Sequence, residues 1–264
     1  MPLPDSITLA HKLQFIKSQG GVLMEDTVAK LNEMVRESKR IVFFGGAGVS
    51  TESGIPDFRS TDGLYNQKYQ YPPEMIVSHT FYEDYPEEFF DFYKNRMLFL
   101  DAKPNAAHLK LAELEQAGKL TAVITQNIDG LHQAAGSKNV LELHGSVLRN
   151  YCEDCEKFFD VSYVKNSKGV PVCDKCGGRV KPDVVLYEEN LNMDTLEAAV
   201  NYISQADMLI IGGTSLVVYP AAGLIRYYQG NKLVLVNKSE TSADRRANLV
   251  IHDSIGKVFS QIIL

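Results

Sequence analysis

Six short runs of apolar residues, rich in Val, Ile and Leu, recur along the chain. They lie at residues 41–44, 122–125, 140–143, 208–211, 233–236 and 249–251. Each run is nearly continuous in hydrophobic residues and does not alternate with polar ones, which is typical of parallel strands covered on both faces. We interpret the six runs as the strands of one buried parallel sheet.

Amphipathic stretches separate several of these runs. Between residues 106 and 117, Ala107, Leu111, Leu114 and Ala117 recur at steps of three and four, which places them on one face of a helix. Similar patterns predict helices at residues 25–34, 196–203 and 221–228. Strands that alternate with helices of this length indicate βαβ units. We therefore predict an α/β fold with a doubly wound, Rossmann-like parallel sheet.

Two stretches interrupt this alternation. Residues 58–104 are rich in Tyr, Phe and Pro and are expected to form a loop followed by a helical module, whereas residues 151–182 contain all four cysteines. We predict a Rossmann-like domain with a small inserted domain. The Rossmann-like domain is expected to comprise residues 24–57, 101–150 and 183–264, and the small domain residues 58–100 and 151–182. Residues 1–23 are expected to be an N-terminal extension or leader.

The charge and hydropathy of the chain narrow its class of partners. The formal net charge is −6 and the pI about 5.6, whereas proteins that follow the phosphate backbone of DNA or RNA usually present a basic face. The sequence contains no run of 18 apolar residues, and its amino terminus lacks the apolar core of a secretory signal. We therefore expect a cytoplasmic protein that binds neither nucleic acid directly nor a membrane.

The four cysteines predict a structural zinc site. Cys152, Cys155, Cys173 and Cys176 form the pattern C-x2-C-x17-C-x2-C, in which each close pair supplies two thiolates from one tight turn. The alternatives are two disulfides, which a cytoplasmic setting disfavours, or four unrelated buried thiols. Four protein ligands leave no coordination position open, so a single Zn²⁺ here would be structural and not catalytic.

A glycine-rich turn follows the first predicted strand. The sequence Gly-Gly-Ala-Gly-Val-Ser at residues 45–50 allows a tight turn and a close approach of the backbone to a pyrophosphate. Such a turn also serves simply to pack a helix against a sheet, and the third glycine and the acidic residue of the complete dinucleotide fingerprint are absent. The turn alone therefore leaves nucleotide binding and simple packing both open.

Polar residues follow two other predicted strands at their carboxyl ends, where open α/β sheets bind ligands. One group contains Gln126, Asn127 and Asp129, and the other contains His144, which Gly145 follows. A lone histidine more often lies on the surface or in the core than in a catalytic site. The place of His144 at a strand end, opposite a second polar strand end, nevertheless favours an imidazole that accepts a proton near neutral pH.

Seven motifs occur in a definite order along the chain. They are Gly46-Ala47-Gly48-Val49-Ser50, Gly54-Ile55-Pro56-Asp57-Phe58-Arg59, Thr125-Gln126-Asn127-Ile128-Asp129, His144-Gly145, the paired cysteines, Pro182-Asp183-Val184-Val185 and Gly213-Thr214-Ser215. In order and spacing they resemble the motifs of the sirtuin family, most of all its bacterial members with a short catalytic core. The resemblance extends from about Met24 to near the end of the chain. It implies an NAD-dependent protein-lysine deacetylase that releases nicotinamide, O-acetyl-ADP-ribose and free lysine.

The resemblance also implies which residues bind NAD. The phosphates and the adjacent ribose would be held by Gly46, Ala47, Gly48, Ser50 and Thr51 together with Gly213, Thr214 and Ser215. Asn237 would reach the adenosine ribose, and Asp253 or Ile255 would line the adenine. Asp57, Phe58 and Arg59 would belong to the mobile cofactor loop. The nicotinamide pocket would be formed by Asn127, Ile128 and Asp129, and the nicotinamide ribose would contact Gln126 and His144. His144 and Asn127 would be the catalytic residues.

The segment formed by Val184, Val185, Leu186 and Tyr187 resembles the edge on which the family binds an acetyl-lysine protein or peptide as an added strand. The alternative is an ordinary interior strand. Glu188 departs from the family pattern, in which this position commonly holds glycine, so the geometry of the edge is left open.

Two features of the sequence favour different acyl groups. Asp57 resembles the deacetylating branches of the family, whereas Tyr93 and Arg96 match the Tyr-x-x-Arg spacing with which desuccinylating relatives bind a carboxylate. Residues three apart on a helix are neighbours in any case. Acetyl-lysine is therefore the favoured substrate, and a desuccinylase or broader deacylase is the alternative.

Three further functions are left open by the sequence. The first is transfer of ADP-ribose to a protein side chain, the second is nucleic-acid binding by the zinc ribbon, and the third is NAD sensing without turnover. Product masses, salt-dependent nucleic-acid binding and nicotinamide release, respectively, distinguish them from deacetylation.

Overall fold

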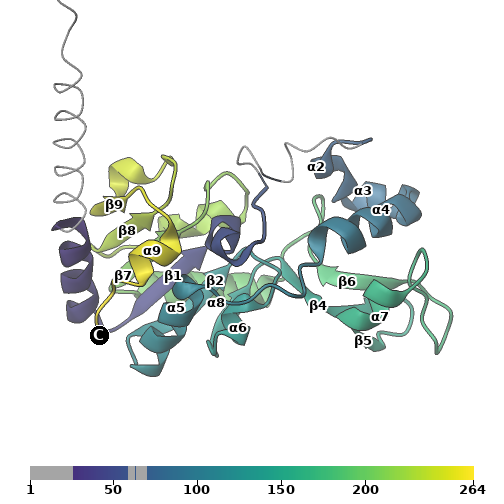
Figure 1. Cartoon of the computed structure of the whole chain (residues 1–264), viewed down its shortest axis with the longest axis horizontal. Helices are drawn as coiled ribbons and strands as arrows, with labels where there is room; N and C mark the ends of the chain where they lie inside the picture. Colours follow the sequence, from purple (N-terminus) through teal and green to yellow (C-terminus); the bar gives the residue numbers. More distant parts are fainter. Residues whose placement is uncertain (1–25, 59–62, 64–69) are drawn as a thin grey trace, which may run out of the picture.

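A six-stranded parallel sheet lies at the centre of the larger part of the molecule (Figure 1). The structure is a computed structural model that describes residues 26–58, 63 and 70–264. The strands are β1 (Ile41–Gly45), β2 (Leu120–Thr125), β3 (Val140–Glu142), β7 (Met208–Gly212), β8 (Leu233–Val236) and β9 (Leu249–Ile251). Their order is β3-β2-β1-β7-β8-β9, and all neighbouring pairs are parallel. All six runs predicted from the hydrophobic pattern are strands of this sheet, so the predicted fold class is confirmed.

Helices cover both faces of the parallel sheet. Successive side chains of a strand point to opposite faces, and Phe43 and Phe44 accordingly belong to different hydrophobic clusters. The Phe43 face is covered by residues 26–37, by α5 (Ala106–Gln116) and by α9 (Ile255–Phe259). The Phe44 face is covered by α8 (Met193–Gln205) and η5 (Ala221–Tyr227). The sheet is therefore buried on both sides, as its continuous hydrophobic strands require.

One predicted helix has a different form. The sequence predicts an α-helix at residues 221–228, but the structure has the 3-10 helix η5 there. Pro220 precedes it and Gly223 lies within it, and both residues disfavour a regular α-helix. A 3-10 helix repeats every three residues, which brings Ala221 and Leu224 onto the same buried side.

The strand order fixes where a ligand can bind. From β1 the chain proceeds outward through β2 to β3 on one side, whereas β7, β8 and β9 extend the sheet on the other side. The switch point lies between β1 and β7, and in open α/β sheets the crevice outside the carboxyl ends of the strands at this point binds ligands. The loops that leave β1 and β7 therefore flank the expected binding crevice.

A second, antiparallel sheet lies beside the first (Figure 1). It consists of β4 (Gly145–Cys152), β5 (Phe158–Asp160) and β6 (Val180–Val184), with β4 in the middle. Its neighbours are α7 (Val161–Asn166), α2 (Pro73–Ile76), α3 (His79–Asp84), α4 (Pro86–Phe92) and a π-helical turn, η4 (Tyr93–Met97). An aromatic core that includes Phe81, Tyr82, Phe89 and Phe90 joins these helices to the small sheet. The hydrophobic pattern of the sequence does not predict this sheet.

The four cysteines meet at one end of the small sheet. Cys152 ends β4, Cys155 follows in a turn, and Cys173 and Cys176 flank a second turn. All four Sγ atoms lie within 4.8 Å of one another. The Cys152–Cys176 and Cys155–Cys173 sulfur separations are 3.4 and 3.7 Å, close to the separation of about 3.8 Å that tetrahedral zinc–thiolate bonds require. The residues therefore fit one structural Zn²⁺.

The helices formed by the described residues are short. Among the described residues, none combines the length and the apolar composition that crossing a membrane requires.

We expect the replacement of Cys155 by Ser to remove zinc and to destabilise the fold, because the free energy of binding a structural metal is part of the free energy of folding. The zinc content should fall well below one ion per chain, and the midpoint of thermal unfolding should fall with it. Atomic emission and circular dichroism measure the two quantities. A variant that keeps one zinc and the wild-type midpoint would contradict the assignment.

Candidate active site

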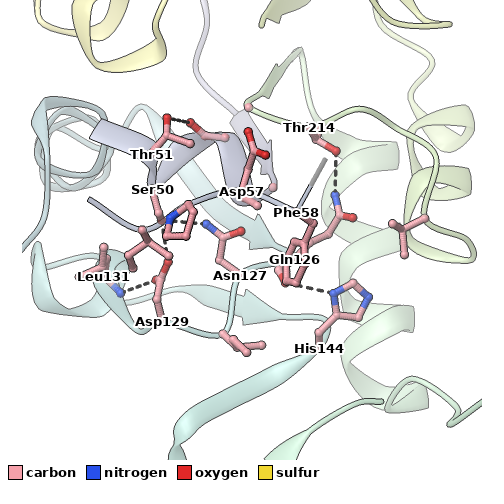
Figure 2. Close-up of a pocket in the computed structure, with 18 of the residues that line it drawn as sticks. Ser50, Thr51, Asp57, Phe58, Gln126, Asn127, Asp129, Leu131, His144 and Thr214 are labelled. Carbon is pink, nitrogen blue, oxygen red and sulfur yellow. Dashed lines mark hydrogen bonds between the residues drawn. The ribbon is translucent and has the colours of Figure 1, made fainter. Parts of the chain in front are cut away.

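A cavity of about 1130 Å³ opens at the carboxyl ends of the parallel strands. Its walls include the residues that follow β1, β2, β3 and β7, together with Asn237 after β8 and Asp253 after β9. Apart from Arg59, which lies outside the described residues, every NAD-binding and substrate-binding residue expected from the sequence lines this one cavity, from Gly46 to Ile255. Figure 2 shows a central group of these side chains converging on it.

The loop after β1 packs directly against the loop after β7. The amide of Gly48 donates to the carbonyl oxygen of Gly213 at 2.8 Å. A Cβ atom on Gly48 would lie 2.8 Å from that same oxygen. Gly213 has a φ of +57°, and a Cβ there would lie 2.4 Å from the amide nitrogen of Val49. Glycine is therefore needed on both sides of the contact.

Ser50 connects the glycine turn to the strand end of β2 (Figure 2). Its hydroxyl donates to Asp129 Oδ2 at 2.6 Å and accepts from Asn127 Nδ2 at 3.0 Å. The other oxygen of Asp129 accepts from the Leu131 amide at 2.9 Å. One amide and one carboxylate are thus held in fixed orientations at the wall of the cavity.

Gln126 connects the loop after β7 to His144. Its side-chain Nε2 donates to Thr214 Oγ1 at 3.1 Å, and its main-chain oxygen lies 3.0 Å from His144 Nδ1. A carbonyl oxygen can only accept, so the proton of the neutral imidazole must be on Nδ1. Nε2 is then the unprotonated nitrogen, which is the state that a general base requires.

The surroundings of His144 favour its neutral form. Burial lowers the pKa of the imidazole, and the hydrogen bond to the Gln126 carbonyl raises it by less, so the pKa lies below its ordinary value. His144 is therefore a neutral base at physiological pH.

Two other histidines, His108 and His132, are buried and pack edge to face with ring centroids 4.7 Å apart. Burial lowers the pKa of His108 to about 4 although Asp129 opposes the change, and burial with the neighbouring His108 lowers the pKa of His132 to about 3. Both rings are neutral near pH 7 and bring no positive charge to Asp129.

Asn105 is a positioning residue that the sequence analysis missed. Its Oδ1 accepts from the Ala107 amide and begins α5 as an N-cap. Its Nδ2 donates to the Val49 oxygen at 2.7 Å and to Ser53 Oγ at 3.0 Å. The side chain therefore holds the 3-10 turns η1 (Ala47–Val49) and η2 (Thr51–Ser53). An Asn directly before a helical pattern was the available signal.

The expected substrate edge begins in β6 and continues beyond it. Only Val184 belongs to the strand. The amides of Val185, Leu186 and Tyr187 donate to the His144 oxygen, to the Glu189 carboxylate and to the Val77 oxygen. Beyond Val184 the segment is therefore irregular, and each of its three amides donates within the chain.

The backbone and the contacts of Glu188 account for a glutamate at a position where the family commonly has glycine. Its φ is +75°, a left-handed conformation that glycine adopts most readily. The carboxylate accepts from the Thr80 amide at 2.8 Å and from the Thr80 hydroxyl at 2.7 Å. These two bonds tie the edge to α3 and offset the unfavourable backbone conformation.

Tyr93 and Arg96, the pair considered for a succinyl carboxylate, do not line the cavity. Tyr93 is buried in the aromatic core, where its ring stacks on Phe89. The side chain of Arg96 is exposed. The two side chains therefore lie in different surroundings, one in the aromatic core and one at the surface.

None of the four cysteines lines the cavity. The metal site and the cavity are therefore separate, in agreement with a structural role for zinc.

Comparison with known proteins relates this arrangement to a family. A model of the Sir2 family matches residues 46–220. The NAD-dependent protein deacetylase of Clostridium perfringens is 64% identical over 243 residues, which cover 91% of this chain and 100% of the relative. The protein of the same name from Cutibacterium acnes is 52% identical over 238 residues, which cover 89% of this chain and 97% of the relative.

Solved structures show the same similarity. A Sir2 variant with a deacetylated p53 peptide and 3′-O-acetyl ADP-ribose is 43% identical, with a TM-score of 0.82 over 89% of this chain and 96% of that one. A Sir2 complex with a p53 peptide and NAD⁺ is also 43% identical, with a TM-score of 0.78 over 87% and 94%. The chain therefore belongs to the Sir2 family, the sirtuins.

Proposed function

We propose that the chain is an NAD-dependent protein-lysine deacetylase that works in the cavity described above. The convergence of His144, Asn127, Asp129 and the glycine turn on one cavity is the observation that carries this proposal. The names of the bacterial relatives and the Sir2 complexes with NAD⁺ and peptide support it.

The residues around the cavity fit NAD. A volume of about 1130 Å³ exceeds the range of about 300–1,000 Å³ usual for small-ligand sites, which leaves room for a dinucleotide and an acyl-lysine together. Backbone amides and hydroxyls of residues 46–51 and 213–215 would hold the phosphates and the adjacent ribose. Asn237, Asp253 and Ile255 would contact the adenosine, and Asp57 and Phe58 would cover the reacting end.

NAD, when bound, supplies a ribose carbon from which nicotinamide departs and to which the acyl oxygen of the modified lysine adds. Asn127, Ile128 and Asp129 would orient the nicotinamide, with Asp129 accepting from its carboxamide. The Ser50 hydroxyl keeps Asn127 and Asp129 in place, so both groups are oriented before the ligand arrives.

His144 would act as general base. Its Nδ1 proton is committed to the Gln126 carbonyl, so Nε2 can take a proton from a ribose hydroxyl. Gln126 itself would contact the same ribose, and its side chain is held by Thr214. Gln126 would then position the imidazole through its main-chain oxygen and the ribose through its side chain.

A peptide substrate would add as a strand along residues 184–187, which line the cavity. The amides of Val185, Leu186 and Tyr187 already donate within the chain. The carbonyls of Val184, Leu186 and Tyr187 also accept within the chain, from Lys181, Glu189 and His79. A substrate amide would therefore donate to the Val185 carbonyl. Such main-chain pairing reads little sequence, so the acyl-lysine and not its neighbours would dominate recognition.

Incubation with an acetyl-lysine peptide, with and without NAD⁺, followed by mass spectrometry, tests the proposal. We expect NAD⁺-dependent loss of the acetyl group together with nicotinamide and O-acetyl-ADP-ribose. His144→Ala should lower kcat by about 10²–10⁴-fold, the usual contribution of general acid–base catalysis. Zinc content and the unfolding midpoint should be unchanged in this control.

Other products would identify another function. A gain of ADP-ribose on protein would establish the transferase alternative, and NAD⁺ binding without nicotinamide release would establish a sensor. Wild-type turnover by His144→Ala would refute the role of the imidazole.

The pH dependence of kcat/KM should report the lowered pKa of His144. The base must be neutral to work, so activity is lost only as the pH falls through the lowered pKa. We expect the acidic limb to lie below about pH 6.5, the ordinary pKa of histidine. An acidic limb above this value would show that the imidazole is charged at neutral pH and would contradict the assigned environment.

Acetyl-lysine should be preferred to succinyl-lysine. A succinyl carboxylate would lose hydration in the cavity, and neither Tyr93 nor Arg96 lines the cavity to compensate. We expect kcat/KM for a succinyl peptide to be at least about tenfold lower, and Arg96→Ala to leave both rates unchanged. Efficient desuccinylation that depends on Arg96 would show that the pair binds substrate.

A further inference from the structure

His144 lies where the chain crosses from one sheet to the other. β3 ends at Glu142 in the parallel sheet, and β4 begins at Gly145 in the small sheet, so the crossover has only two residues. The His144 oxygen accepts from the Val185 amide at 3.0 Å. Gly145 has a φ of +75°, and a Cβ there would lie 1.9 Å from the Asp183 oxygen. The orientation of His144 therefore depends on how closely the crossover is held against β6.

A bulge follows the crossover directly. Ser146 pairs with Asp183, and the next residue of β4 that pairs with β6 is Asn150, opposite Pro182. Residues 147–149 are therefore extra on β4. Within the bulge, the Val147 amide donates to the Ile128 oxygen at 2.9 Å. Bulges commonly re-aim side chains beside active sites, and this one turns β4 toward the strand end of β2.

Arg149, the last residue of the bulge, joins both sides of the crossover. Its Nε donates to Asp183 Oδ2 at 2.8 Å, and its Nη1 donates to Glu142 Oε2 at 2.7 Å. The Glu142 side chain is only 8% exposed, against 38% for Arg149 and 40% for Asp183. Glu142 is the last residue of β3, and Asp183 lies in β6. The guanidinium thus closes a loop of chain, residues 142–149, that contains His144.

We propose that Arg149 is a positioning residue for the reaction at His144, which it serves by clamping the crossover between the two sheets. The inference rests on the proposed function. The planar fork of arginine matches two carboxylates in fixed directions, which a lysine cannot do. Displacement of a reacting group by about 1 Å can cost as much as about 100-fold in rate, so loss of the clamp should lower turnover.

The closing experiment compares Arg149→Met with Arg179→Met. Arg179 is a matched control because its guanidinium also bridges two carboxylates, those of Glu83 and Glu153. It lies beside the small antiparallel sheet and does not line the cavity. For Arg149→Met we expect kcat to fall about tenfold or more, with the KM values for NAD⁺ and peptide within about twofold of wild type. For Arg179→Met we expect kcat within about twofold of wild type, whatever the change in its unfolding midpoint.

Hydrogen exchange of the protein without NAD⁺ gives a readout that does not depend on activity. Arg149→Met should speed exchange of the amides in residues 143–147, and Arg179→Met should not. Arg149→Lys should give an intermediate kcat because it keeps one charge and loses the fork. Asp183→Asn removes one of the two carboxylates that bind Arg149, at a half-exposed position, and should also lower kcat. This variant tests the inference if Arg149→Met fails to fold.

The outcomes separate the two proposals. An inactive wild type refutes the proposed function, and the inference falls with it. An active wild type with unchanged kcat in Arg149→Met and Asp183→Asn refutes only the inference. An equal fall of kcat in Arg179→Met also refutes it, because the effect would then be a general loss of stability.

Discussion

The contact between the amide of Gly48 and the carbonyl of Gly213 determines most of the site. It brings the loops after β1 and β7 together backbone to backbone, which only glycine permits at these two positions. Ser50 follows on one loop and Thr214 on the other, and both reach the strand end of β2. Ser50 bonds Asn127 and Asp129, and Thr214 bonds Gln126. The close approach of the loops after β1 and β7 thus orients the polar side chains at the end of β2.

Much of this site was predictable because parallel strands end at the same edge of a sheet. The glycine turn, the Gln126–Asp129 group and His144 each follow a hydrophobic run, and all line one cavity. The positioning roles of Asn105 and Arg149 were not predicted, because the bonds from Asn105 to Val49 and from Arg149 to Asp183 join residues more than 30 apart in sequence. Tyr93 and Arg96 have a suggestive spacing in the sequence, yet they do not line the cavity. A spacing along a helix does not reveal which way the helix faces.

The parallel sheet was predictable and the antiparallel sheet was not, for physical reasons. Strands buried on both faces are continuous hydrophobic runs, which are conspicuous in a sequence. β5 has only three residues, β6 contains Pro182, and β4 is interrupted by the bulge at residues 147–149. Proline and a bulge both break the alternation on which strand prediction depends. The cysteine spacing predicted the metal site but not the strands that carry it.

The partner of His144 decides what kind of base it can be. A carboxylate beside Nδ1 would favour the charged imidazole and raise its pKa, so that more of the base would be protonated at neutral pH. The carbonyl of Gln126 fixes the same tautomer through a neutral acceptor, which raises the pKa by less than burial lowers it. The nearest fixed charge in sequence, on Glu142, is paired with Arg149. The site therefore orients the imidazole without charging it, which suits the proposed removal of a proton from a weakly acidic ribose hydroxyl near pH 7.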